Sequence, residues 1–123
     1  MRFLVVAETA EDFDAWLDGQ SQQAVQPGEG SEAAAGLEVF QTGGCIACHT
    51  IEGVEGATQT VGPTLTHFGS RRTLAGGILE NTPDNVARWL NRPGDVKTGA
   101  KMRDYGLTDE QIEDLVTYLR SLE

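Results

Sequence analysis

The residues best suited to chemistry are two cysteines and a histidine near the middle of the chain. Cys45, Cys48 and His49 form a Cys-x-x-Cys-His run, and the sequence has no other cysteine. This run is the attachment signature of a c-type haem. Two thiols at this spacing can add to the two vinyl groups of one porphyrin, while the adjacent histidine ligates the iron. The motif predicts one haem c, covalently bound through Cys45 and Cys48, with His49 as a metal ligand.

Three other uses of this motif are weaker interpretations. A disulfide or thioredoxin-like redox pair belongs in a βαβ context, whereas this motif follows a predicted helix and a Gly-Gly break. A zinc site needs a fourth ligand and a second regularly spaced pair, and only His67 remains. A catalytic cysteine needs its own base, and His49 stands at the wrong distance along the chain. Haem accounts for every cysteine, so it is favoured.

The second axial ligand of the iron is expected to be Met102. An electron carrier keeps both axial positions filled so that its geometry changes little on oxidation, and a thioether favours Fe(II). Met102 lies in a loop between two predicted helices, far enough along the chain to close over the opposite face of the haem. The remaining candidates are His67 and an open site, because Met1 is terminal.

Length, composition and charge narrow the class of protein. The 123 residues have room for one compact domain with a short appendage. Glycine is about 12% of the chain against a usual ~7%, which suggests backbone wrapped closely around a non-protein group. A net charge of −10 argues against nucleic-acid binding. No apolar run predicts a membrane span and no leader precedes the body, so we expect a soluble fragment or a mature chain, its native start upstream or processed.

Residues 1–30 are predicted to form an extension ahead of the main domain. The apolar, β-branched stretch 2–8 predicts a strand. Thr9 begins a capping-box-like start for a short helix that Gly19 can end. Residues 20–31 are polar and rich in Gly, Pro and Ser, which is typical of a flexible linker.

The extension carries apolar side chains that would be exposed if it hung free: Phe3, Val5, Phe13, Trp16 and Leu17. Such a surface is an aggregation liability in a soluble chain. We therefore expect the strand and helix to fold back onto the main domain, away from the haem edge, with Trp16 buried. The alternative is a loose segment that pairs with another domain in a longer protein.

Residues 31–123 predict an all-α domain. Ser31 caps a helix that ends at a Gly-Gly pair, and a short helix is expected over 72–79. Thr82, followed by proline and an acid, predicts a third helix start. Thr108 opens a capping box before an amphipathic last helix.

From residue 31 to its end, the sequence resembles a monohaem class I cytochrome c. The matching residues come in the family's order: Gly36, Phe40, Cys45, Cys48, His49, Gly62, Pro63, Leu65, Arg71, Asn81, Trp89 to Pro93, Gly99, Met102, Leu115, Tyr118 and Leu119. The resemblance implies the class I cytochrome c fold around one covalently bound haem, with the strand-plus-helix extension added in front.

The resemblance also implies roles for single residues. The Pro63 carbonyl would accept the Nδ1 proton of His49, which fixes the orientation of the ring. Arg71 and Asn81 would face a haem propionate. Trp89 would line the side of the sixth ligand, although ordinary core packing is nearly as good an interpretation.

Packing between the first and last helices of the domain is implied too, with Gly36 and Phe40 against Leu115 and Tyr118. The chain departs from the family's pattern around the sixth ligand. Thr98 stands where the family often has proline, and Ala100 stands where it often has a hydroxyl residue. Arg103 stands where proline is frequent. These departures bear on the stiffness of the loop and on its propionate contacts more than on ligation.

Residues 1–17 resemble the end of the dinuclear-copper domain in subunit II of haem-copper oxidases. Met1 matches a copper-ligating methionine, but the partner cysteine and histidine ligands are missing, so no copper site is expected. A copper-domain tail joined to a cytochrome c is the arrangement of caa(3)-type oxidase subunit II. The chain is thus expected to be the C-terminal domain of such a subunit or a stand-alone cytochrome descended from it.

The function implied is one-electron transfer, without substrate chemistry of its own. The donor would be a periplasmic or membrane-bound redox protein, and the acceptor the copper domain of a terminal oxidase in aerobic respiration. The expected location is the periplasmic side of the bacterial cytoplasmic membrane. The alternatives are a haem sensor or peroxidase-like protein with an open sixth site, and a dimerising c-type module of a larger dehydrogenase.

Overall fold

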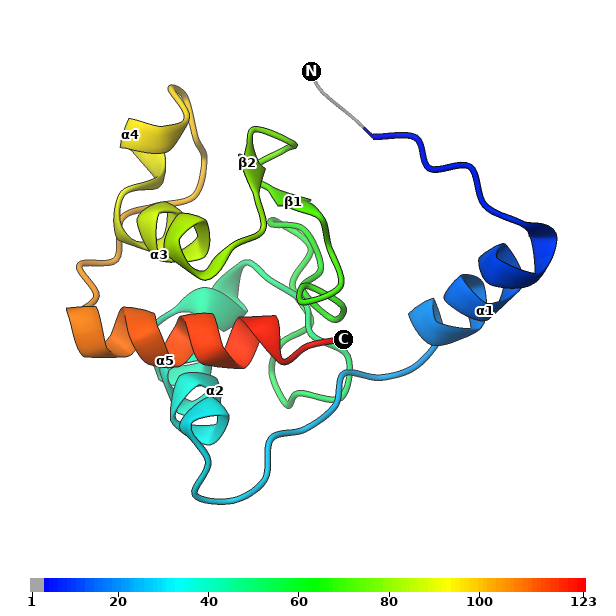
Figure 1. Ribbon diagram of the computed structural model, residues 1–123. Helices are drawn as coiled ribbons and strands as arrows, with labels where there is room; N and C mark the ends of the chain where they lie inside the picture. Colours follow the sequence, from blue (N-terminus) through cyan, green and yellow to red (C-terminus); the bar gives the residue numbers. More distant parts are fainter. Residues whose placement is uncertain (1–3) are drawn as a thin grey trace.

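The computed structural model describes residues 4–123, and Figure 1 shows several helices and one short hairpin. The elements are α1 (Ala10–Gln20), α2 (Glu32–Thr42), the 3-10 turn η1 (Cys45–Ala47), β1 (Thr73–Leu74), β2 (Leu79–Glu80), α3 (Pro83–Asn91), α4 (Pro93–Val96) and α5 (Asp109–Arg120). The expected helical class is confirmed, with a small antiparallel sheet added to it. No helix within residues 4–123 has both the length and the apolar character needed to cross a bilayer.

The helix starts lie where the capping residues predicted them. The Ser31 hydroxyl accepts a hydrogen bond from the backbone of α2, and the Thr82 hydroxyl does the same for α3. The start of α5 is a capping box with hydrogen bonds in both directions. The Thr108 hydroxyl accepts from the backbone N–H of Gln111, and the Gln111 side chain accepts from the backbone N–H of Thr108 at 3.0 Å. Each cap satisfies donors that the first turn of a helix leaves unpaired.

Helices α2 and α5 cross closely because of one glycine. A β-carbon on Gly36 would clash with the Asp114 carbonyl and lie 2.5 Å from Cβ of Tyr118. Beside this point the rings of Phe40 and Tyr118 pack with their centroids 6.0 Å apart, and both residues are buried. The packing expected between the first and last helices of the domain is confirmed, and it forms one wall of the core.

The helix expected over residues 72–79 is wrong, because the structure has a hairpin there. Strand β1 pairs antiparallel with β2, so that Thr73 lies opposite Glu80. The turn between them has positive φ at Ala75 (56°), Gly76 (76°) and Gly77 (83°). Backbone in that region cannot continue a right-handed helix, and glycine adopts it at low cost.

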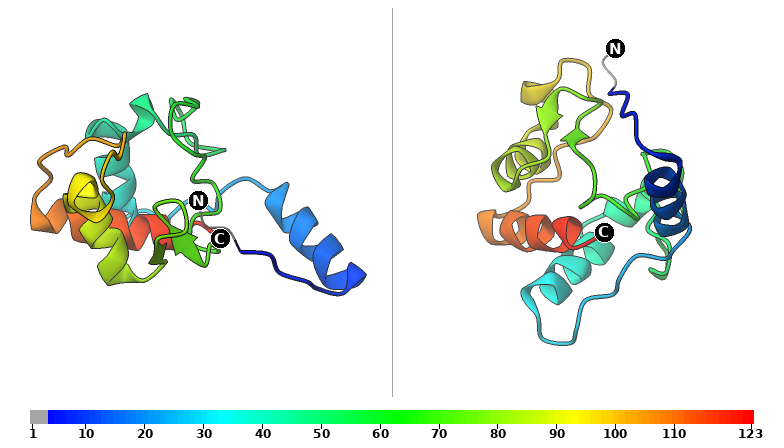
Figure 2. Two further views of the ribbon diagram at one scale, coloured as in Figure 1. Left: turned by 90° about the horizontal axis from the view of Figure 1, so that it is seen from above. Right: turned by 45° about the vertical axis from the view of Figure 1, so that its right-hand side comes forward.

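Helix α1 forms as expected but does not dock. None of its residues is buried, Trp16 is 53% exposed, and Figures 1 and 2 show the helix set apart from the others. The expectation that Trp16 is buried is therefore wrong. Outside the extension and linker, the large exposed apolar residues are Val61, Ile78 and Tyr105. Two of them, Val61 and Tyr105, line one cavity of the domain.

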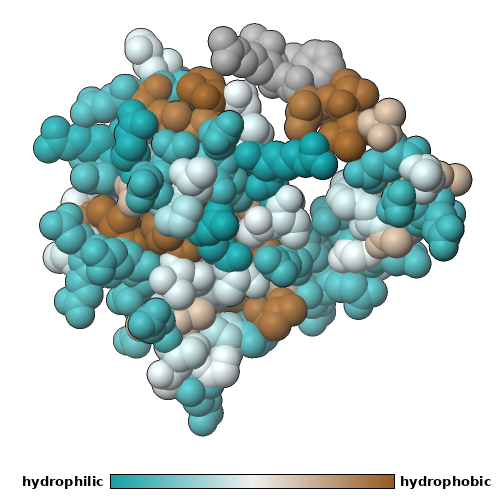
Figure 3. Space-filling model, viewed as in Figure 1, coloured by the Kyte–Doolittle hydropathy of each residue, from teal (hydrophilic) through white to brown (hydrophobic). Residues whose placement is uncertain are grey.

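The strand expected over residues 2–8 is also wrong in its described part, because residues 4–8 have no regular secondary structure. An isolated strand with no neighbour to pair with is unstable in water. Figure 3, viewed as in Figure 1, shows apolar atoms beside the grey terminus, over the first described residues. The predictions for Met1 and Phe3 concern residues outside the described range.

The linker departs from a free coil at its centre. Ala24 is buried, and its N–H donates to the Glu52 carbonyl at 3.2 Å. Side chains of Gln23 and Gln26 both lie close to Gly53. The linker is therefore attached to the loop that follows the cysteine motif, and the boundary between residues 30 and 31 stays a prediction.

Candidate cofactor site

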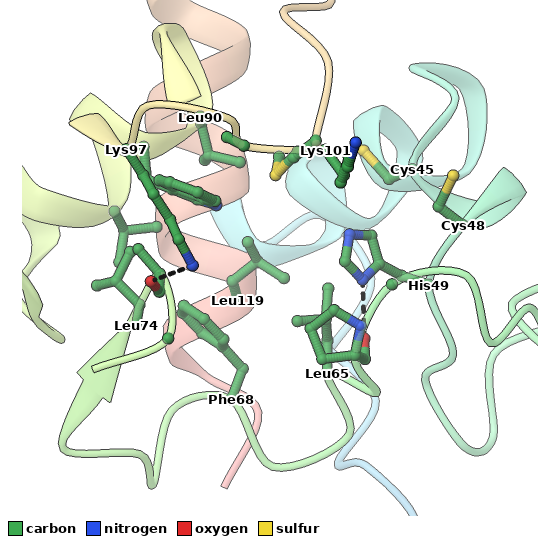
Figure 4. Close-up of a pocket in the computed structure, with 18 of the residues that line it drawn as sticks. Cys45, Cys48, His49, Leu65, Phe68, Leu74, Leu90, Lys97, Lys101 and Leu119 are labelled. Carbon is green, nitrogen blue, oxygen red and sulfur yellow. Dashed lines mark hydrogen bonds between the residues drawn. The ribbon is translucent and has the colours of Figure 1, made fainter. Parts of the chain in front are cut away.

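One large cavity gathers most of the residues singled out from the sequence. Its volume is about 980 Å³, and Figure 4 shows part of its lining. The candidates that line it are Cys45, Cys48, His49, Pro63, Arg71, Trp89 and Met102. Asn81 is not among the lining residues. The tertiary structure thus brings together side chains from η1, from α3 and from several loops.

A tight turn holds the cysteine motif together. Gly44, with φ of 88°, precedes η1, and the N–H groups of Cys48 and His49 donate to the Cys45 carbonyl at 3.1 and 3.0 Å. Cys45 and Cys48 are not joined in a disulfide. Burial raises the pKa of the Cys45 thiol and favours its protonated form. The turn places two thiols and the imidazole on the same cavity (Figure 4).

His49 is oriented by its hydrogen bond to Pro63. Its Nδ1 lies 2.8 Å from the Pro63 carbonyl oxygen, the contact that the resemblance implied. A carbonyl only accepts, so Nδ1 carries the proton and the neutral ring keeps a lone pair at Nε2. That nitrogen is the one available to a metal ion.

Met102 lines the same cavity, whereas His67 does not. Met102 is partly buried against the hydrophobic core, in the loop between α4 and α5. His67 is buried elsewhere, and its Nε2 has no hydrogen-bond partner within residues 4–123. Of the two candidates for the second axial ligand, only Met102 is placed at the cavity.

Arg71 and Asn81, which were both expected to face a propionate, have different positions in the structure: Arg71 lines the cavity and Asn81 does not. The Arg71 guanidinium donates to the Thr64 carbonyl and lies 5.9 Å from the centre of the Phe68 ring. Burial lowers the pKa of Arg71, which still stays charged at neutral pH. The Asn81 amide instead donates to the carbonyls of Phe68 and Arg71, at 2.8 and 3.0 Å. Asn81 therefore stabilises the chain behind the cavity.

The lining includes residues that sequence reasoning passed over. Phe68, Leu74 and the hairpin turn contribute apolar surface, and Lys97 crosses one end of the cavity. The turn was missed because it was interpreted as a helix. One sequence feature could have pointed to Lys97. It lies in the stretch 71–103, which has seven basic residues against three acidic ones.

The chemistry of the lining fits a haem. Its walls are mainly apolar, and they carry two thiols, one oriented imidazole and one thioether. Four cations and no carboxylate side chain line it, which suits a ligand with two acidic groups. Within residues 4–123, no three His, Cys, Asp or Glu side chains are grouped as a metal site, so a zinc site lacks its ligands.

Comparison with known proteins agrees with this chemistry. A family model described as Cytochrome c matches residues 33–123. The chain is 37% identical to cytochrome c oxidase subunit 2 of Alkalihalophilus pseudofirmus over 124 residues, and 38% identical to that of Bacillus sp. strain PS3 over 127. The protein of the same name from Bacillus subtilis is 30% identical over 127 residues. Each match covers all of this chain and 35% of the relative, so the chain spans about a third of their length.

Proposed function

The chain belongs to the cytochrome c family of haem electron carriers, and on that premise we propose that it carries single electrons towards a terminal oxidase. The observation that carries the proposal is the meeting of Cys45, Cys48, His49 and Met102 on one cavity. These four side chains would hold one haem c, the two cysteines by covalent bonds and His49 and Met102 as iron ligands. When bound, the haem supplies a one-electron Fe(III)/Fe(II) couple.

Each residue of the site has a separate task. Cys45 and Cys48 would hold the group by thioether bonds, which would keep it in place in both oxidation states. His49, with its proton held at Nδ1 by Pro63, binds through Nε2. Met102 would supply the second protein ligand of the iron, a soft sulfur that favours Fe(II) and raises the potential. With both positions filled, little rearrangement accompanies electron transfer.

The partners are inferred from the relatives and from the extension. The relatives are named as oxidase subunits, and the segment that precedes the domain resembles the end of an oxidase copper domain. We place the acceptor at such a copper domain, and the donor at a periplasmic or membrane-bound redox protein. The working location would then be the periplasmic side of the bacterial membrane, free or as a tethered domain.

The first test establishes haem attachment and ligation. The protein is produced in a host that attaches haem to Cys-x-x-Cys-His motifs, and the alkaline pyridine spectrum of the product is recorded. We expect the position of the pyridine spectrum to report two thioether bonds. The untreated oxidised protein should show a far-red band from a methionine–Fe(III) bond. Rapid binding of carbon monoxide by the reduced wild type would instead favour the sensor or peroxidase-like alternative.

The second test addresses the acceptor. The reduced protein is mixed rapidly with a soluble copper domain of an oxidase, and oxidation of the haem is followed by absorbance. We expect electron transfer that accelerates with the concentration of the copper domain. A copper domain without copper is the control. Absence of transfer, with haem and ligands intact, would contradict the acceptor while leaving the carrier function standing.

A further inference from the structure

We propose that Lys97 binds one of the two haem propionates, in the place that the family resemblance assigns to Asn81. The inference rests on the proposed haem. Two carboxylates on one haem need compensation, and the resemblance offered Arg71 and Asn81 for it. The structure leaves only Arg71 of that pair at the cavity.

Asn81 has no donor left for a ligand. Its amide nitrogen has two N–H groups, and these donate to the Phe68 and Arg71 carbonyls. Its carbonyl oxygen lies 3.4 Å from a guanidinium nitrogen of Arg120. The side chain is therefore committed to protein partners.

Lys97 has donors to spare and stands at the cavity. Its ammonium donates to the Ala75 carbonyl at 3.4 Å, which is long for a hydrogen bond. An ammonium has three donors, and Lys97 has no other hydrogen bond and no carboxylate partner within residues 4–123. The weak contact holds the charge beside the cavity without neutralising it.

The position of Lys97 matches the chemistry of the porphyrin. The vinyl groups and the propionates of haem lie on opposite edges of the ring. Thioether bonds at Cys45 and Cys48 fix the vinyl edge, so the propionate edge must point to the other end of the cavity. Figure 4 shows the two cysteines at one end and Lys97, near Leu74, at the other.

The remaining cations of the lining are less well placed. Lys101 and Arg103 flank Met102 and make no hydrogen bond or ion pair to the described residues. Figure 4 shows Lys101 at the end that holds Cys45. Arg71 and Lys97, in contrast, are both attached to main-chain carbonyls, of Thr64 and Ala75. We assign one of these two cations to each propionate.

The test compares Lys97→Gln with the charge-matched control Lys101→Gln. The reduction potential of each holoprotein is measured from mildly acidic to mildly alkaline pH. A cation paired with a propionate keeps it ionised. Without Lys97, the pKa of that propionate rises into the measured pH range. Its titration then changes the reduction potential of the iron. We expect Lys97→Gln to lower the potential and to add a fall of potential with rising pH, and Lys97→Arg to restore both.

Lys101→Gln is expected to shift the potential without adding this pH dependence. Infrared difference spectra of oxidised and reduced protein give a second measurement, in which the carboxylate bands move only in Lys97→Gln. If Lys97→Gln behaves like Lys101→Gln in both measurements, the inference is overturned. Failure of the wild type to bind haem would instead overturn the proposed function, so the two failures are distinguishable.

Discussion

A β-carbon on Gly62 would lie 2.5 Å from Cε1 of the His49 ring, closer than real β-carbons approach another atom. The backbone at Gly62 also donates to the Cys48 carbonyl at 2.7 Å, so it has little freedom to move away. The absence of a side chain at this position therefore lets the imidazole take the orientation that its bond to Pro63 defines.

Gly62→Ala is expected to displace the His49 ring and to weaken its hydrogen bond to Pro63. The fraction of protein that carries correctly ligated haem should fall, as measured by the visible spectrum and by iron content. Gly94→Ala is the control, because a β-carbon there meets nothing within 4 Å. Equal haem content and spectra in the two variants would refute this interpretation of Gly62.

Met102→Ala is expected to abolish the far-red band, lower the reduction potential and allow carbon monoxide to bind, because the iron loses its thioether ligand. His67→Ala is the matched control, since His67 does not line the cavity. It should retain the far-red band. A wild type without the band, in which carbon monoxide binding is gained by His67→Ala and not by Met102→Ala, would reverse the assignment.

Gly36→Ala is expected to destabilise the protein by about 1–3 kcal/mol, because a methyl group would force α2 away from α5. The measurement is chemical unfolding followed by helical circular dichroism. Gly19→Ala provides the comparison, since its β-carbon would meet nothing within 4 Å in α1. That variant should match the wild type or gain a few tenths of a kcal/mol, since alanine favours helix. Equal stability of both variants would contradict the close crossing.

Ionisation of the buried Tyr118 hydroxyl is expected to lower the free energy of unfolding at alkaline pH. Burial raises the pKa of Tyr118 to about 12 from an ordinary 10, and its hydroxyl has no partner within residues 4–123. Between these values the unfolded chain has released the proton while the folded chain still holds it. The free energy of unfolding therefore falls as pH rises from about 10 to about 12, by roughly 2–3 kcal/mol in all.

Tyr118→Phe removes this titration without removing the ring. We expect its alkaline unfolding curve to be flatter than that of the wild type over the same pH range. At neutral pH its stability should be unchanged or slightly higher, because an unpaired buried hydroxyl is removed. Parallel losses in both proteins would assign the alkaline transition to another group.

The extension should contribute little to stability except through Ala24. Trp16→Ala is expected to change the free energy of unfolding by no more than about 0.5 kcal/mol, since the indole is exposed. Ala24→Glu should lower it by more than about 1 kcal/mol, because a charge would enter a buried position. A large loss in Trp16→Ala would show that α1 docks in solution.

Local signals predicted much of the fold correctly. The caps at Ser31, Thr82 and Thr108 act through hydrogen bonds to residues three positions away, so they can be recognised without knowledge of the rest of the chain. The failures also have a local cause. The stretch 72–79 contains Gly76 and Gly77, whose positive φ makes a turn, and its few apolar residues suited either structure.

The extension was misjudged for a different reason. The apolar face of its helix predicted that the helix packs against the main domain. The pattern on one helix, however, does not show whether the domain has a matching surface. The structure shows Ala24, rather than Trp16, as the buried residue. That outcome depends on the shape of the loop near Glu52, which no periodicity encodes.

The sequence by itself predicted covalent haem attachment, because Cys45, Cys48 and His49 lie within five positions and one turn brings them together. The tertiary structure decided which distant residues reach the cavity. It placed Met102 there and left His67 and Asn81 outside it. It also brought Lys97 to the hairpin, across 22 positions of the chain. Such contacts depend on how loops close over a core, and that packing involves every element at once.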